Sequence, residues 1–387
     1  MYQVHYLNKI SPQGTALWTD KYTAVEEFEQ AQAVLVRSAA MHELTLPEGL
    51  LAIARAGAGV NNIPLGSCAE KGVVVFNTPG ANAGSVTELA LCGMLLGSRD
   101  IVGGINWVQS IKDTSDIAKQ VEKGKAKFAG NEIAGKKLGV IGLGAIGGRL
   151  ANAAIKLGMD VYGYDPHISI DAAWHLNHNI VHVRQLDELY AECDIVSLHV
   201  PLLDATKKMI NAETLAKMKD GVILLNFARD LLVDDDALAE ALESGKVRRY
   251  ITDFPNEKTA NMPGVIAIPH LGASTEESED NCAKMAVRQV MDYLENGNIR
   301  NSVNFPECNL GLCNKAGRVT IMHRNIPNCL SRFTTAVSGE GINISDMMNR
   351  SKGDYAYTML DLDQPVPENV IHALEQVEGV LRVRKIK

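Results

Sequence analysis

The chain has 387 residues, more than one ordinary hydrophobic core holds, so we expect two or three domains. It is 46% hydrophobic and 22% charged, and its net charge of -8 argues against nucleic-acid binding, which needs clustered Lys and Arg. No stretch has the roughly 18 apolar residues of a membrane span, and the seven cysteines form no C-x-x-C pair, so we expect a cytoplasmic protein with free thiols and no metal site.

The first hundred residues predict a small α/β domain. Apolar, strand-like runs at 33–38, 51–60 and 72–80 reach Arg37, Arg55 and Asn77. The segment 85–108 then predicts an apolar helix with more hydrophobic surface than one amphipathic face requires. We therefore expect a homo-oligomer, either a dimer or a tetramer.

Residues 134–270 predict a larger parallel sheet, with strand candidates alternating with helical patterns. Several of these strands finish in a polar residue. Ligands of open parallel sheets bind outside the carboxyl ends of the strands, so this series of endings describes a site. The residues are Asp165, His199, Arg229, Asp253 and His270.

The remaining chain predicts a helix, a linker and a third domain. The helical stretch 277–297 is expected to return to the first domain, and 301–316 has the Asn, Gly and Pro content of a linker. Residues 317–387 predict a ferredoxin-like βαββαβ unit. The expected plan is a discontinuous substrate-binding domain (1–98 and 275–300), a nucleotide-binding domain (99–274) and the C-terminal domain (317–387).

A glycine-rich turn follows the strand that ends at Ile141. Gly142 allows a tight turn, Gly144 lets the backbone approach a pyrophosphate, and Gly147 permits close helix packing. A glycine-rich turn without a ligand is the alternative, but the next strand ends at Asp165, whose carboxylate suits the two ribose hydroxyls of a dinucleotide. That carboxylate would repel a 2′-phosphate, so the turn favours NAD over NADP.

Three residues form a candidate catalytic set. Arg229 can hold a carboxylate with two parallel hydrogen bonds, and His270 can exchange a proton near neutral pH. Glu257 could accept a hydrogen bond from His270 and orient its ring. Each residue alone has a plain structural explanation, and the set gains weight from its position after a nucleotide-binding turn.

Several motifs together resemble the D-isomer-specific 2-hydroxyacid dehydrogenases. They are "GLGAIG" (142–147), "HVP" (199–201), "NFARD" (226–230), "DFPNE" (253–257) and "PHLGAST" (269–275). "RAGAGVNNI" (55–63) and "NTPGANAGSVTELAL" (77–91) are similar to members that act on 3-phospho-D-glycerate, and the C-terminal unit resembles an ACT domain. The resemblance implies two Rossmann-like, flavodoxin-like, doubly wound parallel-sheet domains with a cleft between them, followed by a ferredoxin-like ACT domain.

The resemblance also implies a reaction and the residues that carry it. The expected reaction is NAD-dependent oxidation of 3-phospho-D-glycerate to 3-phosphooxypyruvate, the first step of L-serine biosynthesis, with Arg229 binding substrate, His270 as acid/base and Glu257 orienting it. The implied substrate contacts are Arg55, Arg37, Asn82, Ala83 and Gly84. The implied cofactor contacts are Gly142, Gly144, Ala145, Ile146, Gly147, Asp165, His199, Val200, Pro201, Ala228, Asp253 and Gly272.

The chain departs from the family pattern near the catalytic set. Asp230 stands where the family usually has Gly, beside Arg229. The segment from Asp253 to Glu257 is one residue shorter than usual, so Thr252 is an alternative to Asp253 as the nicotinamide contact.

The C-terminal unit departs as well. His323, Asn325 and Asn343 match positions that hold L-serine in serine-sensing ACT domains, but Asn328 replaces the usual Gly. L-serine is therefore a possible effector, and a purely structural or oligomerising unit is the alternative.

Two other functions stay open at this stage. One is a hydroxypyruvate or glyoxylate reductase of the same family. The other is a non-catalytic NAD-sensing corepressor, against which the intact Arg229, Glu257 and His270 set argues.

Overall fold

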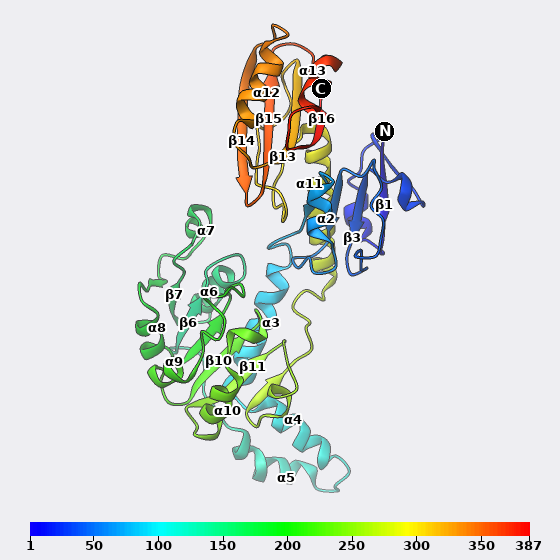
Figure 1. Ribbon diagram of the computed structural model, residues 1–387. Coiled ribbons are helices and arrows are strands. Elements are labelled where there is room, and N and C mark those ends of the chain that lie inside the picture. Colours follow the sequence, from blue (N-terminus) through cyan, green and yellow to red (C-terminus); the bar gives the residue numbers. More distant parts are fainter. The chain divides into compact units, whose positions relative to one another are not determined.

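The computed structural model describes residues 1–387 and divides into two compact units. The first unit comprises Met1–Asn82 and Glu276–Lys387, and the second comprises Ala83–Thr275 (Figure 1). The chain therefore enters the first unit twice. Each unit has parallel-sheet α/β architecture, as the sequence predicts.

The first unit contains a five-stranded parallel sheet in the order β2-β1-β3-β4-β5. Helix α11 (Glu276–Asn296) packs against β3, β4 and β5, while α2 (Leu65–Glu70) precedes β5, and α1 (Pro12–Thr15) contacts α11. The central strands are buried on both faces, which explains their continuous apolar runs. The strands are β1 (Tyr2–Tyr6), β2 (Tyr22–Ala24), β3 (Ala33–Val36), β4 (Ala52–Arg55) and β5 (Val74–Phe76).

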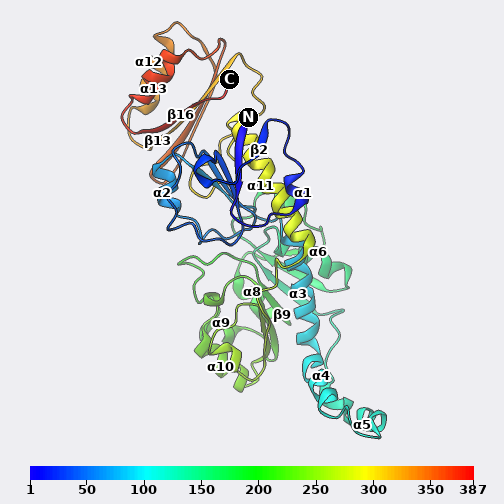
Figure 2. The same cartoon turned by 90° about the vertical axis from the view of Figure 1, so that its right-hand side faces the viewer.

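The C-terminal part of the first unit has the predicted βαββαβ order. It comprises β13 (Gly317–Arg324), α12 (Cys329–Ser338), β14 (Ile344–Lys352), β15 (Tyr355–Leu362), α13 (Glu368–Glu375) and β16 (Val380–Lys385). The strands form an antiparallel sheet in the order β14-β15-β13-β16, and both helices lie on one face of it (Figures 1 and 2). Val319, Ile321 and Leu360 from that face join the helices in one apolar cluster.

The opposite face of this sheet packs against the N-terminal part of the unit. Met322 and Tyr357 belong to the same buried cluster as Tyr293 of α11. The Arg384 guanidinium, only 9% exposed, donates to the carbonyls of Tyr293 and Leu294 at the end of that helix. The four-stranded sheet is therefore covered on both faces.

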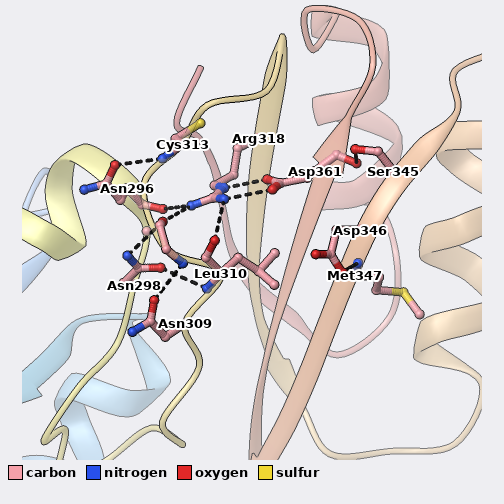
Figure 3. Close-up of polar contacts among 12 residues, drawn as sticks. Asn296, Asn298, Asn309, Leu310, Cys313, Arg318, Ser345, Asp346, Met347 and Asp361 are labelled. Carbon is pink, nitrogen blue, oxygen red and sulfur yellow. Dashed lines mark hydrogen bonds and ion pairs between the residues drawn. The ribbon is translucent and has the colours of Figure 1, made fainter.

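The segment that precedes β13 is held by hydrogen bonds in place of regular secondary structure (Figure 3). Arg318 is fully buried and makes a bidentate ion pair with Asp361, with nitrogen–oxygen distances of 2.5 and 2.8 Å. The same guanidinium donates to the carbonyls of Asn296 and Gly311 at 2.9 and 2.8 Å. Asn298 bridges the segment by donating to Gly311 and accepting from the Leu310 amide.

The second unit contains a seven-stranded parallel sheet in the order β12-β11-β10-β9-β6-β7-β8. Strand order reverses between β6 and β9, which makes the sheet doubly wound. The strands are β6 (Lys137–Ile141), β7 (Asp160–Tyr164), β8 (Val181–His182), β9 (Ile195–Leu198), β10 (Val222–Asn226), β11 (Val247–Thr252) and β12 (Val265–Ala267). The helices around them include α6 (Gly147–Lys156), α7 (Ile170–Trp174), α8 (Leu186–Glu192), α9 (Ala212–Lys217) and α10 (Asp235–Glu243).

The segment expected as one helix over 85–108 forms two. Helix α3 (Ala83–Ser98) ends two residues before α4 (Ile101–Ser110), and α5 (Ile117–Gly124) follows. The break occurs at Asp100, whose carboxylate accepts a hydrogen bond from the Gly103 amide and caps α4. The single-helix prediction is wrong because apolar periodicity outweighed this capping signal.

All seven cysteines are free thiols, as the sequence predicts. Burial raises the pKa of the Cys68 and Cys193 thiols to about 12, which suppresses their ionisation. No group of three or more His, Cys, Asp or Glu residues is arranged to hold a metal ion. None of the helices has both the length and the apolar character needed to cross a membrane.

Replacing Arg318 by Ala should lower the free energy of unfolding of the first unit by about 3–5 kcal/mol, because Asp361 would be left buried without its counter-charge. The exposed pair of Arg332 and Glu378 offers a matched control, and Arg332→Ala should change stability by less than about 1 kcal/mol. Urea denaturation of both variants measures the difference. Equal losses in the two variants would contradict a stabilising role for the buried pair.

Candidate active site

The glycine turn of the second unit has the geometry that its sequence predicts. Gly142 adopts φ +91°, and a Cβ there would lie 2.6 Å from the carbonyl oxygen of His199. A Cβ on Gly147 would lie 1.9 Å from the Gly142 oxygen, so helix α6 begins against the turn. Around Gly144, by contrast, the space is open to at least 4 Å. Of the three motif glycines, only Gly144 has open space where a Cβ would lie.

Asp165 lies just beyond β7 and is tied to the glycine turn. Its Oδ2 accepts a hydrogen bond from the Leu143 amide, and its Oδ1 accepts one from the His167 amide, both at 2.9 Å. These two bonds fix the carboxylate beside the backbone of the turn. A carboxylate in this place can accept hydrogen bonds from ribose hydroxyls.

His199 borders the turn from the end of β9. Its Nε2 lies 2.8 Å from the Ser197 hydroxyl, and its buried Nδ1 has no hydrogen-bond partner. Burial lowers the pKa of His199 to about 4, so the imidazole is neutral at physiological pH. A neutral ring with one vacant polar atom suits contact with a polar ligand.

Arg229 follows β10 and is positioned by a buried amide. The Asn226 side chain is fully buried and donates to the Arg229 carbonyl at 2.8 Å, while accepting from the Ala228 amide at 3.2 Å. The exposed Arg229 guanidinium donates to the Ala228 carbonyl at 2.6 Å. Asp230 opens a short 3-10 turn, and no ion pair joins it to Arg229. The departure from Gly at this position therefore leaves Arg229 free of a carboxylate partner.

An aromatic ring connects Arg229 and His270. The Arg229 guanidinium carbon lies 5.5 Å from the centroid of the Phe254 ring. The His270 ring lies 4.4 Å from the same centroid. A cation and an imidazole, both exposed, are thus held beside one ring at the carboxyl edge of the sheet.

Asp253 is the buried carboxylate of this edge. It is 2% exposed, and its Oδ1 has no hydrogen-bond partner. Burial raises its pKa, while His270, the Gly272 backbone and Arg229 oppose that shift. Thr252 is fully buried and accepts from the Phe254 amide at 3.0 Å. Of these two candidates for the nicotinamide contact, Asp253 has the vacant polar atom.

Glu257 lies in the exposed loop after β11. Its carbonyl accepts from Asn261, but its carboxylate forms neither an ion pair nor a hydrogen bond with His270. The predicted pairing of Glu257 with His270 therefore stays a prediction.

These features fit a dinucleotide in its oxidised or reduced form. The open space at Gly144 can receive a pyrophosphate beside the start of α6, the Asp165 carboxylate can accept hydrogen bonds from ribose hydroxyls, and the vacant Oδ1 of Asp253 can accept one from an amide N–H. Val200 and Pro201 follow His199 directly, Ala145 and Ile146 complete the turn, and Gly272 lies against Asp253.

The first unit holds a separate pair of arginines. Arg55 ends β4, and its Nε donates to the Arg37 carbonyl at 2.8 Å. A Cβ on Gly59 would lie 2.6 Å from an Arg55 nitrogen, so the loop after β4 passes close to the guanidinium. Burial and the neighbouring Arg37 lower the pKa of Arg55, which Cys282 opposes. The repulsion between the two guanidinium groups, which contributes to the lowered pKa of Arg55, would be relieved by an anionic ligand.

The predicted carboxylate-binding loop includes the point in the sequence where the first unit's first stretch ends and the second unit begins. Asn82 ends the first stretch of the first unit, and Ala83 and Gly84 open helix α3. A Cβ on Gly84 would meet nothing within 4 Å. Backbone amides in the first turn of a helix have no intrahelical acceptor, so they can bind a carboxylate.

The predicted effector residues lie in three different settings. His323 is 3% exposed, with its ring nitrogens 2.8 and 2.9 Å from the Arg324 carbonyl and the Thr358 hydroxyl. The side chains of Asn325 and Asn343 donate to Gly353 and Asp363. Asn328 has φ +67°, a left-handed conformation that Asn tolerates better than most residues.

The sequence analysis assigns no role to Asn226 or Phe254. Asn226 lies in a predicted strand, and a buried amide inside such an apolar run indicates a polar network. Phe254 carried no signal, because an aromatic residue after a strand is ordinary core material.

Comparison with known proteins places these features in context. Residues 105–272 match the family described as D-isomer specific 2-hydroxyacid dehydrogenase, NAD binding domain. A D-3-phosphoglycerate dehydrogenase of Haemophilus influenzae is 33% identical over 84% of this chain and 78% of its own length. A hydroxypyruvate reductase of Thermotoga maritima is 37% identical over 74% of this chain and 93% of its own length. The NAD+-bound 3-phosphoglycerate dehydrogenase of Entamoeba histolytica aligns with a TM-score of 0.61 at 27% identity, covering 78% of this chain and 98% of the other.

Gly144→Ala should weaken NADH binding at least about tenfold while leaving the melting temperature unchanged, because its methyl group enters only the open space expected for the pyrophosphate. Gly142→Ala should instead lower the melting temperature, since φ is +91° and the methyl group meets the His199 carbonyl. NADH fluorescence titration and thermal unfolding separate the two effects. Unchanged NADH affinity in Gly144→Ala would argue against this turn as the phosphate site.

Asp253→Asn should stabilise the protein without cofactor by about 1 kcal/mol at pH 7 while reducing turnover, because it removes a buried, half-satisfied carboxylate. The raised pKa means that ionised Asp253 costs stability at neutral pH. The stability gained by Asp253→Asn should therefore vanish as the pH falls below the ordinary carboxyl range, because the Asp253 carboxyl is then protonated in both the folded and the unfolded protein.

Urea denaturation at pH 7 and at pH 3 measures this stability difference, with exposed Asp204→Asn as the control. Destabilisation by Asp253→Asn at pH 7 would show that the carboxylate stabilises the fold.

Proposed function

Because the chain belongs to the D-isomer specific 2-hydroxyacid dehydrogenase family, we propose that it oxidises 3-phospho-D-glycerate to 3-phosphooxypyruvate with NAD, the first step of L-serine biosynthesis. The observation that supports this substrate is the Arg37 and Arg55 pair of the first unit. Arg55 is held by the Arg37 carbonyl, so its guanidinium is fixed in advance for a phosphate.

The remaining substrate groups have their own partners. Arg229 binds the substrate carboxylate and polarises the C2 oxygen, since its guanidinium is exposed and has no anionic partner. The backbone around Asn82, Ala83 and Gly84 binds the carboxylate as well. The first unit's N-terminal part thereby serves as the substrate-binding domain and the second unit as the nucleotide-binding domain.

His270 acts as the acid/base of the reaction. In oxidation it takes the proton of the C2 hydroxyl, and in reduction it returns that proton to the carbonyl oxygen. NAD, held at the glycine turn and at Asp165, would supply the acceptor for the hydride from C2. Phe254 restrains the His270 ring through their 4.4 Å contact, and we assign to Glu257, in the exposed loop after β11, the role of orienting that ring.

The protein assembles as a homo-oligomer through the end of α3 and the exposed face of α4. Leu95, Ile101 and Ile105 are 44%, 40% and 56% exposed, and α4 buries no residue within the chain. The free thiols suit the cytoplasm, where disulfides are reduced.

The C-terminal part of the first unit, from β13 to β16, serves as an ACT domain that binds L-serine. Asn325 and Asn343 are exposed and offer amide groups, while buried His323 supports the strand from within. The left-handed Asn328 lets the first loop keep the turn that Gly normally provides.

A hydroxypyruvate reductase is the second candidate. The ion pair between Arg37 and Glu279 favours it, since that carboxylate offsets part of the positive charge available to a phosphate. The two candidates differ in one measurable quantity, the preference for a phosphorylated substrate.

NADH oxidation with 3-phosphooxypyruvate, hydroxypyruvate and glyoxylate should show the highest kcat/KM for the phosphorylated substrate. Arg55→Met should raise KM for 3-phosphooxypyruvate by about tenfold or more and leave KM for hydroxypyruvate within about twofold.

L-serine should suppress turnover if the C-terminal part of the first unit is its receptor.

Thermal unfolding of Arg55→Met serves as the control for misfolding. Equal turnover of hydroxypyruvate, with no selective effect of Arg55→Met, would favour the reductase. NADH binding without any turnover would favour the non-catalytic sensor.

A further inference from the structure

We propose that Glu279 sets the selectivity for phosphorylated substrates by competing with the substrate phosphate for Arg37, an inference that rests on the proposed function. Glu279 lies in the first turn of α11, and its Oε1 is 2.6 Å from an Arg37 guanidinium nitrogen. The two side chains are 44% and 43% exposed. The Arg37 group assigned to phosphate thus already has an anionic partner within the first unit.

The two arginines differ in how firmly they are held. Arg55 is half-buried and donates to the Arg37 backbone carbonyl. The Arg37 guanidinium, in contrast, reaches out to the side chain of Glu279. An exposed pair of long side chains is worth little and rearranges at small cost. Arg37 can therefore exchange Glu279 for another anion, while Arg55 stays in place.

The local charge explains why this exchange affects selectivity. Two guanidinium charges less one carboxylate leave a net charge of +1, facing a phosphate group of about -1.5 to -2 at neutral pH. Cys282 beside them does not change this balance, because burial raises its pKa and keeps the thiol neutral. A substrate without a phosphate gains nothing from Arg37, so Glu279 penalises the phosphorylated substrate alone.

Competition and a positioning role predict opposite changes in phosphate affinity when Glu279 is removed. If Glu279 held Arg37 ready for the phosphate, its removal would weaken phosphate binding. If Glu279 competes, its removal frees Arg37 and strengthens phosphate binding. The exposure of both side chains favours competition, since an exposed ion pair does little to fix the position of the Arg37 guanidinium.

Glu279→Gln should lower KM for 3-phosphooxypyruvate about two- to fivefold, which corresponds to the strength of an exposed ion pair. KM for hydroxypyruvate should stay unchanged. Glu277→Gln is the matched control, because Glu277 lies in the same helical turn, is exposed and forms no ion pair within the first unit. In an Arg37→Gln background, Glu279→Gln should have no effect, which isolates the pair.

Calorimetric titration with inorganic phosphate tests the same competition without catalysis. Glu279→Gln should bind phosphate about two- to fivefold more tightly than the wild-type protein and Glu277→Gln do. A higher KM or weaker phosphate binding would assign Glu279 a positioning role, and no change would remove it from the site; either result overturns the proposal. If Arg55→Met and the substrate comparison show no phosphate preference, the proposed function fails, while the titration still decides the competition at Arg37.

Discussion

Parallel pairing in register is the constraint on which the site of the second unit depends. Ile141 of β6 is level with both Tyr164 of β7 and Leu198 of β9, so the residues that follow these strands meet at one edge. The register continues through Asn226 and Thr252 to β12. Each strand can bury its apolar run only if its polar ending projects beyond the sheet. The core and the arrangement of polar groups therefore have one physical origin.

The polar endings were readable from the sequence because each one interrupts a run of β-branched and aliphatic residues. The βαββαβ order of the C-terminal part was readable for the same reason, and Asn328 was recognisable as a replacement for glycine. Strands β1, β2 and β8 were not predicted; β2 and β8 have only three and two residues, which carry too little periodicity to identify a strand. Contacts between side chains that are distant in the sequence could not be predicted. Glu279 meets Arg37 across 242 positions of sequence, and no local pattern encodes that contact.

Buried polar groups divide into two kinds in this protein. Arg318 and Asp361 satisfy each other and the carbonyls around them, which fixes an irregular segment that has no ladder of its own. Asp253 and His199 each keep one buried atom without a partner. The Arg318–Asp361 pair stabilises the fold, whereas the vacant atoms of Asp253 and His199 lie at the strand edge, where they can bind a cofactor. Buried atoms without a partner also occur away from this edge, at Tyr190 and Tyr293 for example, so the strand-end position of Asp253 and His199 is what distinguishes them.

The four-stranded C-terminal sheet, covered on both faces, also limits how this chain can be rebuilt. Its inner face shares a core with α11, and Gly297 admits the Thr320 side chain so closely that a Cβ would come within 2.6 Å of it. Removing the sheet would uncover Tyr293 and Phe305 to solvent, where apolar surface promotes aggregation. The C-terminal part therefore cannot be deleted or transferred to another protein as an independent module. Either change requires redesign of the apolar surface that its removal exposes.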